Sequence, residues 1–484
     1  MNYILGKDRS QVRLECLEDC VEENSEVRVI DKIIDTLNIE DLGFKIGNNE
    51  VVGRPMFDPK DILKLFIYGY FNGIRSSRKL AKQARINKEI IWLINGLEPR
   101  YRVIADFRKD NIDALTKLFE SFVDYCIKLG LYGKELVAVD GTKLEASASK
   151  RKHYSKNKLA KMKDLVQIKI NEYMHDLEMN DFSDDEEDVK LKKEEIKNAI
   201  KELENKVTEY ADFEKRLEES QTNEINLTDP DAKTVKFGAN QGIDIGYNVQ
   251  AVVDSKNKLI ATFEVTNNSA DQGQLYNMSD KAKKTFDVEN IECLADKGYF
   301  DPSDFKKCEE NQIVCYVPKP TFGNSIGDPV YFNDKFKYNA QDNTYICPQK
   351  QVLLCITKKA DAVEKRYTNK KACSNCINKD KCTTAKNGRV IRRRANEDYV
   401  DIVNNRTKEN KEKYKQRQLI IEHVFGTLKR SMNFTYLLLR GFEKVTGEIS
   451  IAFFCYNLKR VINILGIKKF LGYLVDYKII KAAA

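Results

Sequence analysis

The sequence predicts an α/β protein whose core is a mixed β-sheet covered by helices. Three strand patterns come first and are followed by an alternation of helix and strand patterns, which is the order expected when helices pack against such a sheet. The predicted strands and helices are 131–145, Ile243–Asp254, Lys258–Thr266, a helix from Asp271 to Phe286, a strand at Ile291–Ala295, a helix at Pro302–Gln312 and a strand at Ile313–Val317.

Consecutive helices are predicted before this sheet, from Asp58 to Asn111. Pro59 suits a first helical turn, Asn72-Gly73 ends the first helix, and a basic helix starts at Ser76. A small helical domain with basic residues at a helix start is typical of DNA-binding modules. The residues expected to contact DNA are Arg75, Arg78 and Lys79. A helical bundle that only packs on the next domain is the alternative.

A lysine- and glutamate-rich segment, 156–225, interrupts the strand patterns and contains neither proline nor glycine over most of its length. Its apolar residues follow a 4-3 spacing, which predicts a helical hairpin or coiled coil with a turn near Asn180–Asp188. We expect an inserted arm, either intramolecular or used for dimerisation. The apolar positions are Val166, Ile170, Tyr173, Leu177, Ile196, Ile200, Leu203, Val207, Tyr210 and Leu217.

A second insertion, 318–398, has few helix signals and several clustered cysteines. Cys373 and Cys376 form a C-x2-C knuckle, with Cys382 downstream and Cys347 upstream. Four thiolates of this kind can close a tetrahedral Zn²⁺ site. Buried free thiols are the alternative, and we expect Cys355, in an apolar run, to belong to a core.

Length and charge set further bounds. The chain of 484 residues is long enough for roughly three domains of about 150 residues each, and its formal net charge is +8. The basic residues are clustered, and such clusters would neutralise phosphates. A charged N-terminus and the lack of an apolar run near membrane length predict a cytosolic protein without a membrane span. The clusters are Lys150-Arg151-Lys152, Arg392-Arg393-Arg394, Lys411 to Lys415, Lys429-Arg430 and Lys459-Arg460.

Three carboxylates far apart in the sequence stand where phosphodiester chemistry would need them. Asp140 and Asp296 end apolar strand patterns, and Glu422 lies in a helical stretch from Arg417 to Met432. Mg²⁺ prefers a few carboxylate oxygens together with water and phosphate, and two such ions can activate an attacking oxygen and stabilise a leaving one. Lys429, two turns after Glu422, is expected to contact phosphate.

Other residues near these positions have ordinary explanations. Asp254 ends a strand, Asp244 precedes a glycine, and Asp271 suits the N-cap of a helix, although Asp271 and Asn268 could line the site. His423 adjoins Glu422 but should point to another face of the helix, where it would pack rather than bind metal.

The order of short motifs resembles transposases of bacterial insertion sequences, of the DDE class. Val139-Asp140-Gly141-Thr142 resembles their first-aspartate motif, Ala295-Asp296-Lys297-Gly298-Tyr299 the second, and Val424-Phe425-Gly426 after Glu422 the glutamate helix. Gly246 to Asp254 is similar to their second strand, and the block from Gly69 to Arg108 to their N-terminal helical domain. The likeness spans about residues 50–460.

The resemblance implies a ribonuclease H-like core in which Asp140, Asp296 and Glu422 bind two Mg²⁺ or Mn²⁺ ions. It also implies double-stranded DNA partners, namely terminal inverted repeats and target DNA, a homodimer or larger assembly on DNA, and a bacterial, nucleoid-associated location. The domains expected are a helical domain at 1–125, the core at 131–155, 226–317 and 399–465, insertions at 156–225 and 318–398, and a tail at 466–484.

A subset of the family carries Tyr-x2-Arg-x3-Glu-x6-Lys on the glutamate helix. Lys429 stands at the matching distance after Glu422, but Tyr414 and Arg417 are each one residue too far upstream. One residue turns a helical position by about 100°, so Arg417 is expected to face elsewhere; Arg417 and Arg430 remain candidate DNA contacts. A catalytically silent DNA-binding protein and a nuclease that cuts without strand transfer are the competing functions.

Overall fold

The computed structural model describes residues 10, 14–45, 56–181, 187–238, 242–321, 323, 326–359 and 362–483. Its centre is a six-stranded sheet in the order β4-β5-β1-β7-β8, with β6 pairing β5 along the same edge as β4. Strands β5 and β6 are antiparallel to their neighbours, whereas β1, β7 and β8 are parallel. The strands are β1 (Leu136–Glu145), β4 (Lys233–Gly238), β5 (Gly242–Asp254), β6 (Ile260–Thr266), β7 (Ile291–Leu294) and β8 (Ile313–Tyr316).

These strands form because they are rich in β-branched and aromatic residues flanked by turn residues. The mixed α/β architecture predicted from the sequence is therefore confirmed. Strand β4, and the short pair β2 (His153–Ser155) and β3 (Glu224–Asn226), were not predicted; each is short, and β4 is too polar to stand out.

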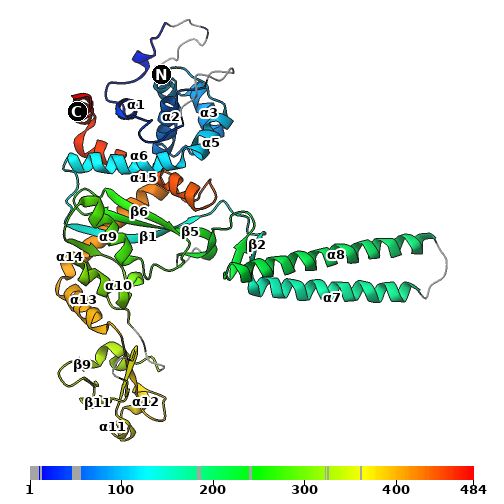
Figure 1. The fold of residues 1–484 in the computed structure, drawn as a ribbon, viewed down its shortest axis with the longest axis vertical. Coiled ribbons are helices and arrows are strands. Elements are labelled where there is room, and N and C mark those ends of the chain that lie inside the picture. Colours follow the sequence, from blue (N-terminus) through cyan, green and yellow to red (C-terminus); the bar gives the residue numbers. More distant parts are fainter. Residues whose placement is uncertain are drawn as a thin grey trace, which may run out of the picture.

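Helices lie on both sides of this sheet, and Figure 1 shows α6 and α15 between the sheet and the N-terminal helices. The other helices that contact strands are α9, α10, α13 and α14. Their bounds are α6 (Ile112–Lys128), α9 (Leu275–Phe286), α10 (Pro302–Glu310), α13 (Glu397–Glu409), α14 (Lys411–Gly426), α15 (Phe442–Leu465) and α16 (Ile467–Ala483).

The N-terminal helices share one continuous apolar core with the sheet, which extends from Val21 to Leu474. Helix α6, expected within the N-terminal domain, packs against α15 and β6. The segment expected to be a tail forms α16, whose Phe470 and Leu474 are buried. The helices before α6 are α1 (Glu26–Thr36), α2 (Pro59–Phe71), α3 (Ser77–Ile86), α4 (Lys88–Leu93) and α5 (Tyr101–Asp110).

Between β2 and β3 the chain forms a hairpin of two long helices, α7 (Lys156–Asp181) and α8 (Glu187–Glu219), which projects away from the sheet (Figure 1). Most of the apolar 4-3 positions form its seam: Ile170, Ile200 and Leu203 make one buried cluster, and Tyr210 and Leu217 contribute to another. Tyr173, also predicted for the seam, is exposed. Most of the predicted turn, 182–186, lies outside the described residues.

A second unit leaves the sheet after β8 and returns at α13; we call residues 326–394 the Cys-rich unit. It is a five-stranded antiparallel sheet with two short helices and its own small core (Figure 1). Its elements are β9 (Lys337–Asn339), β10 (Thr344–Ile346), β11 (Val352–Cys355), β12 (Glu364–Thr368), α11 (Lys370–Ser374), α12 (Lys379–Cys382) and β13 (Ile391–Arg394).

Within the described ranges, no single helix combines the length and apolar composition of a membrane span. Helix α15 and the segment Ile467–Val475 pass that test only when taken together, as a pair bent by 108°.

Candidate active site

Two aspartates predicted from the sequence lie on neighbouring parallel strands. In the β1–β7 pairing, Ala138 is opposite Leu294, so continuing the register by two residues brings Asp140 level with Asp296. Because side chains alternate along a strand, this equal offset places both carboxylates on the same side of the sheet. Asp296 follows β7 and also accepts a hydrogen bond from the Gly298 N–H at 2.7 Å.

A third carboxylate, Asp271, joins this pair from the loop before α9. Its Oδ1 accepts hydrogen bonds from Asn248 Nδ2 and Gln250 Nε2, each at 2.8 Å, and forms an ion pair with Lys143 Nζ at 2.8 Å. The expected N-cap role of Asp271 is wrong, because α9 begins at Leu275, with Gln274 at the cap position. Asp271 is therefore part of the site.

The crowding of these carboxylates raises the pKa values of groups in the site. Burial raises the pKa of Tyr299, and the charges of Asp271, Asp140 and Asp296 each raise it further. Burial also raises the pKa of Asp140 to about 6, Asp296 and Asp271 add to this increase, and Arg417 opposes it. The site thus concentrates negative charge in a half-buried place, which favours a cation.

The glycines that follow the two aspartates leave room that no other residue would leave. A Cβ on Gly141 would lie 2.7 Å from Asp271 Oδ1, and one on Gly298 would lie 2.9 Å from Asp296 Oδ1. Asn248 Oδ1, a buried carbonyl oxygen, lacks a hydrogen-bond partner among the described residues. Carboxylate and amide oxygens are the ligands that Mg²⁺ prefers, so this donor set fits a hard divalent cation.

Helix α14 supplies basic and aromatic side chains to the same place. Arg417 Nη1 lies 3.2 Å from Asp140 Oδ2, so the expectation that Arg417 faces elsewhere is wrong. Burial raises the pKa of Tyr414, and the charges of Asp296 and Asp140 add to that increase while Arg417 opposes it. Position 417, rather than 418, therefore faces the strands in this helix.

Lys429 reaches the site from the π-helical turn Thr427–Ser431 that continues α14. Burial lowers the pKa of Lys429, and the charge of Lys143 lowers it further, whereas Asp140 opposes the shift. Lys143 and Lys429 line one cavity together with two carboxylates, Glu145 and Asp244, and with Phe237 and Thr435. Two lysines thus stand beside Asp140, where a phosphate would meet them.

Glu422 is on the same helix, but its side chain is exposed to solvent. Five residues separate it from Arg417, which corresponds to about 140° around an α-helix. Within the described ranges, no three His, Cys, Asp or Glu side chains are already arranged to hold a metal ion. The structure brings Asp140, Asp271 and Asp296 close together, and Glu422 is an exposed residue of α14. The neighbouring His423 hydrogen-bonds Tyr456 OH at 3.2 Å, as the packing role predicts.

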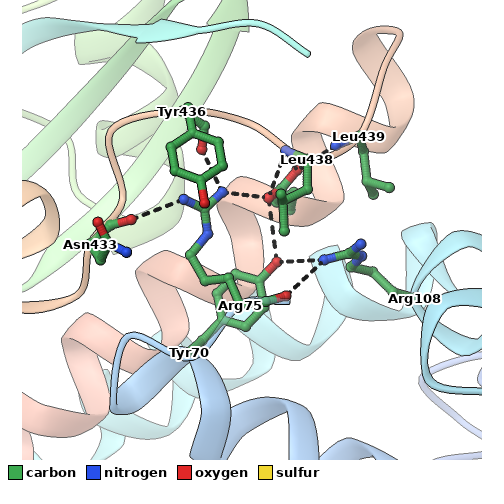
Figure 2. A network of polar contacts seen from close by, with 8 residues as sticks. Tyr70, Arg75, Arg108, Asn433, Tyr436, Leu438 and Leu439 are labelled. Atoms are coloured by element: carbon green, nitrogen blue, oxygen red, sulfur yellow. Dashed lines mark hydrogen bonds and ion pairs between the residues drawn. The ribbon is translucent and has the colours of Figure 1, made fainter. Parts of the chain in front are cut away.

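Arg75, expected to contact DNA, is buried instead, with 3% of its surface exposed. Its guanidinium pairs with Glu448 at 2.8 Å and donates to the Asn433 and Tyr436 carbonyls. Figure 2 shows Arg75 enclosed between the loop that carries these carbonyls and Tyr70. The prediction failed because the local sequence around an arginine near a helix start does not show whether its partner is a phosphate or a buried carboxylate.

The other predicted DNA contacts remain on the surface. Arg78 and Lys79 on α3 are exposed, and the Arg78 guanidinium stacks 5.3 Å from the Tyr101 ring. Arg430 is also exposed. Of the competing aspartates, Asp254 accepts backbone N–H groups of Gly133 and Lys134 at 3.0 Å. Asp244 pairs with Lys150 and lines the cavity that contains Lys143 and Lys429.

The cysteines predicted to bind zinc lie around one cavity of the Cys-rich unit. That cavity is lined by Cys347, Cys373, Cys376 and Cys382. Burial raises the pKa of Cys382, and the charges of the other three cysteines add to this shift. Cys355 packs against the core of the unit, as expected.

Sequence reasoning missed the residues that hold Asp271. Asn248 and Gln250 are polar residues within β5, between the buried residues Tyr247, Val249 and Ala251. Amides inside an otherwise apolar central strand are a signal of a polar site, because buried amides require partners. Lys143 in β1 is likewise a polar residue in a mostly apolar strand.

Comparison with known proteins gives two family matches. Residues 346–462 match the family described as "Transposase DDE domain", and residues 15–110 match the family described as "Transposase domain (DUF772)". Comparison with curated proteins gives no match. Among solved structures, the chain is similar to a piggyBac transposase synaptic complex with hairpin DNA, at 8% identity and a TM-score of 0.33, over 95% of this chain and 80% of that one.

Proposed function

We propose, on the premise that the chain belongs to the DDE-type transposases, that it binds the terminal inverted repeats of a mobile DNA element, cleaves them and joins the ends to target DNA. The observation that carries this proposal is the convergence of Asp140, Asp271 and Asp296, with Arg417 of α14 paired to Asp140. A site of this composition suits a divalent metal on one side and a phosphate on the other.

Divalent cations, Mg²⁺ or Mn²⁺, fit the donor set described above. Asp140 and Asp296 would hold them, with the unpartnered Asn248 Oδ1 close by. When bound, two such ions polarise the phosphate and lower the pKa of the attacking water. The resemblance assigns the third carboxylate to Glu422, whereas the geometry favours Asp271.

The chain's own cations would position the DNA. Lys429, which lies near Asp140 and Lys143, would contact a phosphate there, although Glu145 and Asp244 line the same cavity. Arg417 would leave Asp140 and pair with a phosphate oxygen when a divalent cation binds Asp140. Exposed Arg78, Lys79 and Arg430 would contact the backbone further away and make binding salt-dependent.

The reaction consists of two displacements at phosphorus. In the first, a water oxygen bonds to phosphorus and the bond from phosphorus to the 3′ oxygen breaks, so that the 3′ oxygen leaves as a hydroxyl. In the second, this 3′ oxygen bonds to a target phosphorus, and the target's own 3′ oxygen leaves. The number of phosphodiester bonds is conserved in the second step, which therefore requires no external energy source.

The sheet supports assignment to the ribonuclease H-like class. Three antiparallel strands, β6, β5 and β1, adjoin the parallel strands β7 and β8, and the first aspartate lies on the central strand β1. The helical hairpin α7–α8 and the Cys-rich unit are then insertions into this core. Because a transposase acts on the two paired ends of its element, we expect a homodimer or larger assembly.

The test is a cleavage and joining assay on plasmid DNA that carries the sequences flanking the gene. Wild type and Asp296→Asn are compared with Mg²⁺, with Mn²⁺ and without metal, and new 3′ ends are mapped. Metal-dependent cuts at paired repeats, with joined products, support the transposase. Cuts without joining indicate a nuclease, and binding without cuts indicates a silent DNA-binding protein.

Two further variants assign the third carboxylate. If Glu422 is the ligand, Glu422→Gln abolishes cleavage and Asp271→Asn only weakens it. The reverse order would support Asp271 and would place Glu422 outside the metal site.

A further inference from the structure

The Cys-rich unit has an unusually small apolar core for an independent sheet. Its buried cluster consists of Phe336, Tyr345, Leu353, Tyr367 and Ile391, and it is separate from the main core. Small cores supply little net stability, and natural units of this size commonly add disulfides or a structural metal. None of the cysteines described in this unit takes part in a disulfide. A structural metal is the other cross-link that small units commonly use.

Four half-buried cysteines surround one cavity in this unit. Cys347 follows β10, Cys373 lies in α11, Cys376 follows α11, and Cys382 ends α12. Cys347 lies in the β10–β11 turn, and the other three cysteines lie in the α11–α12 segment that follows β12, so the cavity joins these two segments. Half-buried sulfurs on separate segments are placed to cross-link them.

The backbone around two of these cysteines is shaped to present sulfur. In the turn after β10, the Gln351 N–H donates to Cys347 Sγ at 3.3 Å, and Lys350 adopts a left-handed conformation with φ of 59°. Gly388, with φ of +85°, passes so close to Cys373 that a Cβ there would lie 2.9 Å from its Sγ.

We propose that Cys347, Cys373, Cys376 and Cys382 bind one Zn²⁺ ion that fixes the fold of the Cys-rich unit. Four thiolates match the tetrahedral coordination of structural zinc. Iron shares this ligand chemistry, and metal analysis of the purified protein distinguishes the two metals. No three of these thiols are spaced as metal ligands among the described residues, so binding draws them together. The proposal does not depend on the DNA chemistry.

The first test is metal analysis of the full-length protein purified without added metal. Wild type is expected to carry about one Zn per chain, and Cys373→Ser is expected to lose it. Cys355→Ser is the matched control, because Cys355 belongs to the same unit but does not line the cavity. Asp296→Asn is also expected to retain zinc, which separates this site from the candidate active site.

The outcomes that would overturn the proposal are specific. They are wild-type protein without zinc, bound iron in its place, disulfides among these four cysteines, or equal loss of zinc in Cys355→Ser.

A second measurement uses the native chain, in case Cys373→Ser does not fold. Thiol alkylation is followed by mass spectrometry with and without a chelator, and exposed Cys16 is the internal reference. We expect the four cysteines to react slowly together and to become as reactive as Cys16 when the chelator is added. Reactivity that does not respond to the chelator would contradict a metal site.

Discussion

Two arginine–carboxylate pairs in this protein have the same chemistry but opposite surroundings. Arg75 and Glu448 form a closed cluster, in which the two side chains are 2% and 0% exposed. Arg417 and Asp140 form an open cluster, in which the side chains are 16% and 24% exposed. The first pair joins the N-terminal helices to α15, and the second joins α14 to β1.

In the closed cluster the Glu448 carboxylate is satisfied by protein groups, whereas Arg75 Nε and Arg108 Nε lack a hydrogen-bond partner among the described residues. Glu448 accepts from the Leu438 and Leu439 N–H groups at 2.9 Å and from Tyr70 OH at 3.4 Å (Figure 2). The open cluster instead crowds like charges around Asp140. The difference teaches that a satisfied buried pair holds structure, whereas an unbalanced, half-exposed one is available for a cation or a phosphate.

The largest expected effect belongs to the open cluster. Asp296→Asn keeps an acceptor for the Gly298 N–H but removes a ligand charge, so we expect cleavage to fall on the order of 10⁴-fold, or roughly 5 kcal/mol. The free energy of unfolding should change little. Single-turnover cleavage and urea denaturation measure the two quantities. Retained metal-dependent cutting would remove Asp296 from the site.

For the closed cluster we expect a loss of stability rather than of cleavage. Arg75→Ala leaves Glu448 buried without its cation, and we expect a loss of about 3–5 kcal/mol in the free energy of unfolding. Arg85→Ala is the control, because the exposed Arg85–Glu98 pair should contribute less than about 1 kcal/mol. Similar losses in both variants would mean that burial of the pair is not what matters.

The raised pKa of Asp140, about 6, predicts linked effects of pH. The folded state binds this proton more tightly than the unfolded state does, so ionisation destabilises the fold as pH rises through 6. Asp140→Asn should therefore increase stability by roughly 2–3 kcal/mol near pH 7.5 and not near pH 4. Cleavage, which needs the ionised carboxylate, should fall as pH drops through 6. Urea denaturation and cleavage rates across this range test both. An Asp140→Asn variant with unchanged stability at pH 7.5 would contradict the raised pKa of Asp140.

Lys429 should have a smaller effect. Lys429→Ala removes one phosphate contact beside Asp140, and we expect cleavage to fall roughly tenfold, or about 1.4 kcal/mol. Lys429→Arg, which keeps the charge, should recover part of the rate. A rate that is equally low in both variants would point to a positional rather than an electrostatic role.

The smallest effect is expected at the surface of α3. Arg78→Ala should weaken DNA binding by roughly threefold and reduce its salt dependence by about one counterion. Binding titrations at several salt concentrations measure this slope. Lys163→Ala, on the projecting hairpin, is the control, and an equal change there would indicate a diffuse field instead of a contact.

Much of the candidate site was predictable because strand-end aspartates and the apolar runs before them are local patterns. Asp140 and Asp296 are placed by such patterns, and the Cys373-x2-Cys376 knuckle is equally local. The position of Arg417 was not predictable, because a single residue of helical phase decides which face meets the sheet. For Asp271 the sequence left a helix cap and a place in the site as alternatives, since its partners in β5 and β1 are more than 20 residues away.

The sequence by itself determined the mixed sheet, the helical hairpin and the two aspartates, because periodicity and turn residues act over a few neighbouring positions. Only the tertiary structure decided which charges are buried with partners and which stay open. Arg75 and Arg417 look alike as residues in basic helical segments. Their roles diverge because Glu448 and Asp140, each more than 270 residues away, are brought beside them by packing of the core.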